Sequence, residues 1–193
     1  MTPPSRTQRP PLIIVNGPPA SGKSTLGKEI AAELGIPLLS KDAIKEEMYD
    51  SLGKIERKIS RRLGETSMRL MYTVARKILD AGLGVVIEAN FYHGISEKDL
   101  SKLIAVSDAV MVHCTAPEEI LKQRYIERAQ SGERHPVHDD ANRVDELGKD
   151  LDDGIYDPLN LGIPLIQVDS SDGFDPSVAE IVSRLQDGPV RAA

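Results

Sequence analysis

The sequence predicts an α/β fold in which five short, mostly parallel strands alternate with helices that cover both faces of the sheet. The strand candidates are short unbroken apolar runs, the pattern expected of strands buried on both faces. Segments with apolar side chains at helical spacing lie between them. With 193 residues, 40% of them hydrophobic and 28% charged, the chain has the size and balance of one soluble globular domain.

The strands are expected where apolar runs are bounded by Gly, Pro or polar residues. They fall at residues 12–15, 36–39, 84–88, 109–114 and 164–168. The fourth run ends in Cys114, the only cysteine, which is expected to be a buried structural thiol. A single cysteine excludes an internal disulfide and fits a reducing compartment.

The helices are expected between these runs. The first begins at Lys23, carries Leu26 and Ile30 on one face, and ends at Gly35. Pro117 is expected in the first turn of a later helix, where proline is tolerated. The expected helices cover residues 23–34, 42–49, part of 55–80, 117–130, a stretch before residue 164, and 176–185.

One domain is therefore predicted over residues 12–187, with a flexible arm at 1–11 and a loose tail at 188–193. No run approaches the roughly 20 apolar residues that a membrane helix needs. The arm carries no apolar region of signal-peptide length, so we expect a cytoplasmic protein without a membrane segment. The formal net charge of 24 − 30 = −6 argues against a generic nucleic-acid coat.

One motif dominates the chemistry of the sequence. Residues 17–24 read Gly-Pro-Pro-Ala-Ser-Gly-Lys-Ser and match the phosphate-binding pattern G-x-x-x-x-G-K-[ST]. The motif joins an expected strand to an expected helix, so its backbone N–H groups and the helix N-terminus can cradle phosphate. Lys23 is expected to contact the β- and γ-phosphates of ATP, and Ser24 to bind Mg²⁺. The predicted nucleotide-binding residues are Gly17, Pro18, Pro19, Ala20, Ser21, Gly22, Lys23, Ser24 and Thr25.

Two acidic residues follow expected strands, at the end of the sheet where ligands of such folds gather. Asp42 comes after the second strand, and Glu88 closes the third. A carboxylate in this place can take a proton from an attacking hydroxyl or hold Mg²⁺ through water. The alternative for Asp42 is an N-cap of the following helix. Glu88 is expected to be buried with a function or a partner.

Arginines and histidines gather in the second half of the chain. Arg124 and Arg128 share a helical face, and arginines beside a γ-phosphate stabilise the charge that develops during transfer. The alternative is a solvated face balanced by neighbouring glutamates. Arg134 opens a polar segment, residues 134–140, for which we expect a lid loop or a plain surface loop rather than a metal site. His93 and His113 show no pattern that indicates a role.

These features together resemble the small P-loop kinases grouped around chloramphenicol phosphotransferase, zeta toxin and the kinase domain of polynucleotide kinase. The resemblance covers roughly residues 12–170. It rests on the phosphate loop, on Ser-Lys-Asp-x-x-Lys at residues 40–45, on Val-Ile-Glu-Ala-Asn at residues 86–90, and on the pair Arg124 and Arg128. It implies a three-layer P-loop fold with a small lid at about residues 124–142.

The resemblance also implies roles for single residues. Asp42 is similar to the general base that takes the proton of the acceptor hydroxyl, and Lys45 to a basic residue that helps hold the acceptor. Arg124 and Arg128 resemble lid arginines that grip the ATP phosphates. The third-strand acid is often Asp in relatives, and here it is Glu88. Residues 165–170 look like the last strand and the loop near the adenine.

The sequence thus predicts an ATP-dependent phosphotransferase that moves the γ-phosphoryl group of ATP to a hydroxyl of a small molecule. A 5′-hydroxyl nucleic-acid kinase is the first alternative, against which the net charge of −6 and the 4% aromatic content count. A nucleotide-binding switch that hydrolyses ATP slowly is the second, and a zeta-type toxin is a minor third. The predicted catalytic residues are Lys23, Asp42, Arg124 and Arg128; the predicted acceptor residues are Asp42, Lys45, Glu88, Asn90 and Arg134.

Overall fold

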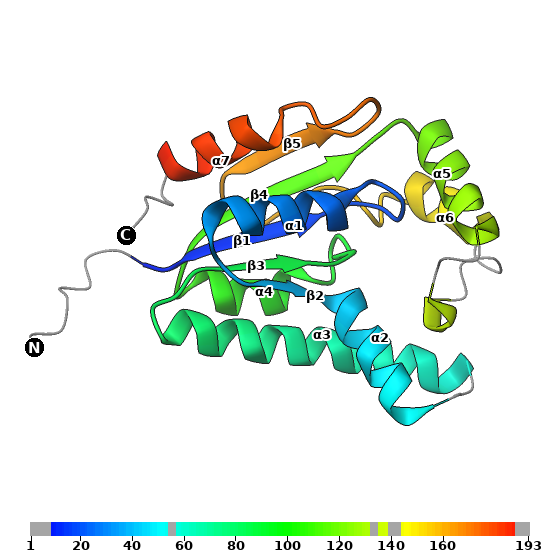
Figure 1. Cartoon of the computed structure of the whole chain (residues 1–193), viewed down its shortest axis with the longest axis horizontal. Helices are drawn as coiled ribbons and strands as arrows, with labels where there is room; N and C mark the ends of the chain where they lie inside the picture. The colour runs from blue at the N-terminus through cyan, green and yellow to red at the C-terminus, as the bar shows by residue number, and fades with distance from the viewer. Residues whose placement is uncertain (1–8, 54–56, 132–134, 139–143, 188–193) are drawn as a thin grey trace, which may run out of the picture.

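The computed structural model describes residues 9–53, 57–131, 135–138 and 144–187 and has three layers, with helices on both faces of a sheet (Figure 1). The strands are all parallel, in the order β2-β3-β1-β4-β5. This confirms the predicted α/β fold and makes the described sheet wholly parallel. The strands are β1 (Pro11–Asn16), β2 (Leu38–Ser40), β3 (Val85–Glu88), β4 (Asp108–Thr115) and β5 (Leu165–Asp169).

Helices connect successive strands and carry the polypeptide back over the sheet, as parallel pairing requires. They are α1 (Lys23–Leu34), α2 (Lys41–Leu52), α3 (Arg57–Asp80), α4 (Glu97–Ile104), α5 (Glu118–Gln130), a 3₁₀ turn η1 (Pro136–His138), α6 (Val144–Asp152) and α7 (Val178–Asp187). Helix α4 was not predicted. It is eight residues long, and Leu100 and Leu103 alone are its fully buried side chains, too few for a helical period to stand out.

The side chains of β1 alternate between two hydrophobic clusters. Leu12 and Ile14 point to the face covered by α3 and α4, where Met71 of α3 is fully buried. Ile13 and Val15 point to the opposite face, which α1 and α7 cover. Strands β1, β3 and β4 are therefore buried on both faces, as their apolar runs indicated, whereas the edge strand β5 is largely exposed and the prediction of a buried run is wrong there.

Some boundaries differ from the predicted ones. Proline accounts for several differences, because its ring fixes φ and it has no N–H to donate. Strand β2 begins at Leu38, after Pro37, and α5 begins at Glu118 with Pro117 as its N-cap. Pro11, which was assigned to the arm, is the first residue of β1.

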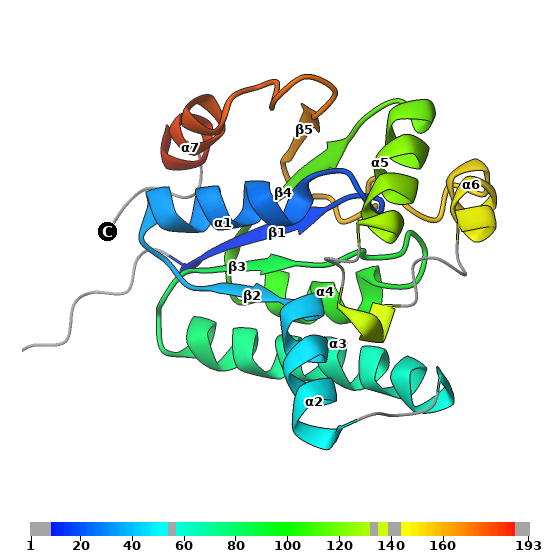
Figure 2. The ribbon, with the colours of Figure 1, turned by 45° about the vertical axis from the view of Figure 1, so that its right-hand side comes forward.

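The carboxyl ends of the strands all lie at one edge, and the loops that follow them share this edge with α5, η1 and the start of α2 (Figure 2). Ligands of open parallel sheets bind at such an edge. Among the described residues, no helix combines the length and apolar character that crossing a bilayer requires.

Candidate active site

The phosphate loop closes tightly against β4. Gly17 has φ +149°, and a Cβ built there would lie 2.0 Å from the Cys114 carbonyl oxygen, so only glycine fits. Gly22 has φ +82° and is the N-cap of α1. Ala20, between them, also has a positive φ of 64°. This sequence of left-handed conformations turns the loop around the space in front of α1.

The loop and α5 enclose a cavity of about 250 Å³. Two arginines of α5 and the lysine of the loop bring positive charge to it, and the N-terminus of α1 adds a partial positive charge. Lys23 is only 7% exposed and donates to the Pro18 carbonyl oxygen at 3.2 Å. The lining residues are Ala20, Gly22, Lys23, Ser24, Thr25, Arg124 and Arg128. Such a cavity suits a polyphosphate.

Arg124 ties α5 to the loop that follows β5. Its Nη2 donates to the carbonyl oxygens of Ser170 at 2.8 Å and Ser171 at 3.0 Å. Arg128, one turn further, holds its guanidinium 5.2 Å from the centre of the Tyr125 ring, a cation–π contact. Both arginines are therefore held at the cavity wall by protein contacts, and neither is a merely solvated charge.

Glu88 lies between the phosphate loop and α2. Its side chain is 2% exposed, and its oxygens accept from Ser24 Oγ at 3.1 Å and from Ser40 Oγ at 2.7 Å. Ser40 also accepts from the Ala43 N–H, which makes Ser40 the N-cap of α2. The alternative that Asp42 is this N-cap is therefore wrong, because Asp42 lies inside the first helical turn.

Asp42 stands on the α2 side of this network. Its carboxylate accepts from Lys41 Nζ at 2.9 Å, and His138 Nδ1 lies 3.9 Å from its other oxygen. Lys45, one turn along α2, is 8% exposed and donates to the Val137 carbonyl oxygen at 3.1 Å. Asn90 is half-buried in the loop after β3. Arg134 lies outside the described residues.

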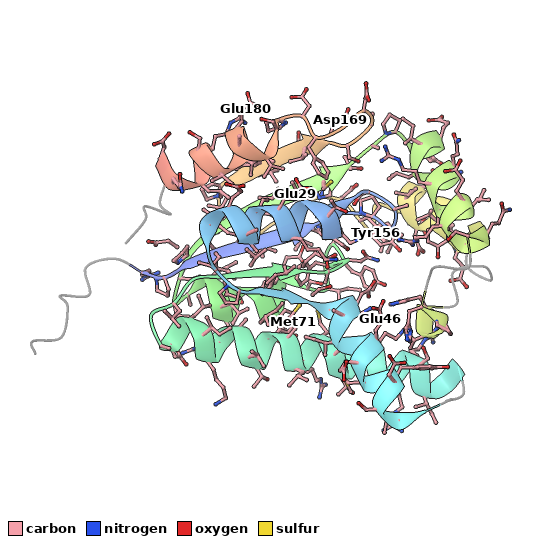
Figure 3. The ribbon with its side chains drawn as sticks, viewed as in Figure 1. Glu29, Glu46, Met71, Tyr156, Asp169 and Glu180 are labelled. Atoms are coloured by element: carbon pink, nitrogen blue, oxygen red, sulfur yellow. The ribbon has the colours of Figure 1, made fainter. Side chains whose placement is uncertain are left out.

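The η1 turn, part of the segment expected to be a lid or surface loop, docks on α2 through pairs of histidine and carboxylate that the sequence did not predict. His138 Nε2 lies 2.6 Å from Glu46 Oε1, and His135 Nε2 lies 3.0 Å from Asp50 Oδ1. Figure 3 shows Glu46 on the side of α2 that faces η1. Glu46 and Asp50 are four residues apart on one helical face, and this spacing was the available signal.

His135, directly before this turn, and His138, within it, thus pair with different carboxylates of α2. Within the part of the chain that the structure describes, no His, Cys, Asp and Glu side chains gather into a metal-binding group of three. The Mg²⁺ that accompanies ATP needs oxygen donors from only one or two protein groups. Ser24 Oγ with the Glu88 carboxylate directly behind it fits that requirement.

Comparison with known proteins agrees with this geometry. The family model described as AAA domain matches residues 12–148, more than half of the chain. A crystal structure of a kinase-like protein from Chloroflexus aurantiacus is 35% identical, has a TM-score of 0.79, and its match covers 93% of this chain and 98% of that chain. A cytidylate kinase of Ignicoccus hospitalis is 26% identical over 135 residues, 60% of this chain and 75% of that protein.

A more distant structure shows the fold alone. Kti12 of Chaetomium thermophilum, solved with ADP-AlF3, is 16% identical with a TM-score of 0.64, and the match covers 92% of this chain and 98% of that chain. The resemblance to small P-loop kinases is therefore confirmed, while the finer likeness to chloramphenicol phosphotransferase, zeta toxin and polynucleotide kinase stays a prediction. This chain belongs to the AAA_33 family of AAA domains, and its structural relatives are small P-loop kinases.

Proposed function

We propose that this protein is an ATP-dependent kinase that transfers the γ-phosphoryl group to a hydroxyl of a small molecule. The observation that carries the proposal is the hydrogen-bonded link from Ser24 through Glu88 to Ser40. This link holds the first turn of α2, with Asp42 in it, beside the phosphate loop. A nucleotide switch needs only the loop, whereas phosphoryl transfer also needs a group that orients the acceptor oxygen.

On the donor side, the protein supplies positive charge around the phosphates. Lys23 contacts the β- and γ-phosphates, and Arg124 and Arg128 balance the charge that spreads over the γ-phosphate oxygens as the bond to the leaving oxygen lengthens. Mg²⁺ bound with ATP would neutralise further phosphate charge. Ser24 would be its direct ligand, and Glu88, which accepts from Ser24 Oγ, would orient that ligand rather than the acceptor.

On the acceptor side, Asp42 receives the proton. The acceptor hydroxyl oxygen attacks the γ-phosphorus, the bond between that phosphorus and the β–γ bridging oxygen breaks, and the hydroxyl proton passes to the Asp42 carboxylate. Lys41 and His138 both lie beside Asp42 and hold it in place until the acceptor binds. Lys45 and Asn90 remain proposed contacts of the acceptor.

The test is ADP formation from Mg-ATP in the presence of a panel of hydroxyl compounds, with a 5′-hydroxyl oligonucleotide as one member. We expect a small molecule to raise the rate well above the acceptor-free rate. Asp42→Asn should remove this stimulation, while Glu47→Gln, an exposed charge on the same helix, should leave it intact. Stimulation by the oligonucleotide alone, or by no compound, would overturn the proposal.

A further inference from the structure

A second and larger cavity, of about 600 Å³, lies at the same edge of the sheet but over the ends of β4 and β5. Its floor comes from the two strands, and the loop after α6 forms one wall. Figure 3 shows Tyr156 of that loop and Asp169 of β5 toward the carboxyl end of the sheet. The volume falls in the range of about 300–1,000 Å³ that is typical of small-molecule sites.

This cavity is separate from the phosphate-binding cavity. The two have no lining residue in common, and neither Asp42 nor Glu88 lines the larger one. Pro18 is the phosphate-loop residue that lines the larger cavity. A ligand of the larger cavity therefore need not displace the phosphates of the nucleotide.

The lining is acidic. Asp157, Asp169 and Asp175 are among its lining residues, and no Lys or Arg is among the described residues that line it. Hydrogen bonds from the Ser171 side chain and backbone lower the pKa of Asp169, so that this carboxylate is ionised at neutral pH. In the described part of the chain, no donor is hydrogen-bonded to the side chain of Asp157 or Asp175.

A buried histidine gives the cavity a second polar feature. His113 lines it, is 5% exposed, and its Nδ1 has no hydrogen-bond partner among the described residues. Burial lowers the pKa of His113, against the opposing effect of Asp157, and the neutral ring adds no positive charge.

Asn16, which lies beside His113 in the sheet, also has a buried polar atom without a hydrogen-bond partner among the described residues. Asn16 of β1 pairs in register with His113, is fully buried, and its Nδ2 also has no partner among the described residues. Buried polar atoms without a partner are uncommon and call for an explanation. Of these two residues, His113 alone lines the cavity, and its ring can accept a hydrogen bond from a ligand N–H there.

We propose that this cavity is a binding site for a small organic cation, a protonated amine on an apolar body. The ammonium group lies among the carboxylates of Asp157, Asp169 and Asp175. The apolar body packs on Pro18, Tyr156 and the neighbouring Pro158. The site is independent of the phosphoryl-transfer chemistry proposed above.

The probe is benzylamine, with benzyl alcohol as its neutral counterpart of similar shape. Binding to the full chain is measured by calorimetry, and amide chemical shifts identify the contacted residues. We expect benzylamine to bind at least about tenfold more tightly than benzyl alcohol, because the amine alone gains the carboxylate attraction. Saturating Mg-ATP should leave this affinity unchanged, and the shifts should centre on residues 113–117 and 156–158.

Two variants and a control sharpen the test. Asp157→Asn and Gln167→Lys, both at exposed lining residues, should each weaken benzylamine binding about tenfold or more without weakening benzyl alcohol. Asp153→Asn, an exposed acid in the same loop outside the lining, should change neither. Equal affinity for amine and alcohol, no effect of either lining variant, or displacement by ATP would overturn the proposal.

Discussion

Glu88→Gln tests whether Glu88 supports binding of Mg-ATP or binding of the acceptor. The substitution keeps the size of the side chain and removes its charge. Ser24 and Ser40 each donate to one of the two Glu88 oxygens. Glutamine offers one acceptor oxygen and one N–H₂ group, so one of the serines loses its acceptor. A hydrogen bond to a charged group contributes about 1.5–3 kcal/mol, which sets the scale of the local loss.

The effect on the nucleotide depends on Mg²⁺. Because Glu88 orients the proposed metal ligand Ser24, its loss should weaken Mg-ATP binding about 10- to 100-fold, the usual cost of removing such a supporting contact. Binding of ATP without Mg²⁺ should instead stay equal or become tighter. The reason is that a buried negative charge beside the phosphates has been removed.

The assay is calorimetric titration of ATP with excess Mg²⁺ and again with a chelator, for wild type and Glu88→Gln. Glu29→Gln, an exposed acid on α1, is the control and should behave as wild type in both titrations. Unchanged Mg-ATP affinity in Glu88→Gln, together with a raised KM for the acceptor, would refute this reasoning. Glu88 would then belong to the acceptor pocket, as the sequence had suggested.

Three further predictions concern the phosphate loop and β4. Lys23→Met should lower the rate of ADP formation on the order of 100-fold or more by removing one charge that stabilises the transition state, whereas Lys28→Met on the exposed face of α1 should not. Gly17→Ala should destabilise the fold by about 1–3 kcal/mol in urea denaturation, because its Cβ meets the Cys114 carbonyl oxygen at 2.0 Å; an unchanged midpoint would show that the loop adapts freely. Burial raises the pKa of Cys114 to about 11 from its ordinary 9.0, so the unfolded chain loses this proton first. Stability should therefore fall by about 2–3 kcal/mol as the pH rises from 9 to 11, and Cys114→Ser should lose this part of the pH dependence.

The sheet could be predicted from the sequence because burial on both faces leaves a direct trace. Leu12–Val15 and Val85–Ile87 are apolar at every position and lie in the two hydrophobic clusters. Helix α4 shows no comparable pattern in the sequence, because only two of its side chains, Leu100 and Leu103, are buried. Short amphipathic helices of this kind are recognised through their packing partners, which the sequence does not display.

The donor half of the site could also be predicted, because the phosphate loop is one contiguous segment between a strand and a helix. The rest depends on residues distant in the sequence. The contacts of Glu88 with both Ser24 and Ser40 follow from strand register, which brings Ser40 opposite Glu88 in the sheet. Nothing in the local pattern distinguishes a carboxylate facing the metal from one facing the acceptor.

The larger cavity could not be predicted from the sequence either, because its lining residues are distant from one another along the chain. His113 comes from β4 and Asp157 from a loop some forty residues later, so their meeting is a product of the tertiary fold. The single buried histidine in a strand showed no motif. Only its burial and its missing hydrogen-bond partner among the described residues mark it.

The most direct test of the proposed activity is the fate of the γ-phosphate. Protein is incubated with γ-labelled Mg-ATP and a library of hydroxyl compounds, and the labelled species are separated and identified. The account predicts that label appears on the hydroxyl of a small molecule with wild-type protein and not with Asp42→Asn. Label found solely in inorganic phosphate, or on a nucleic-acid 5′ end alone, would contradict it.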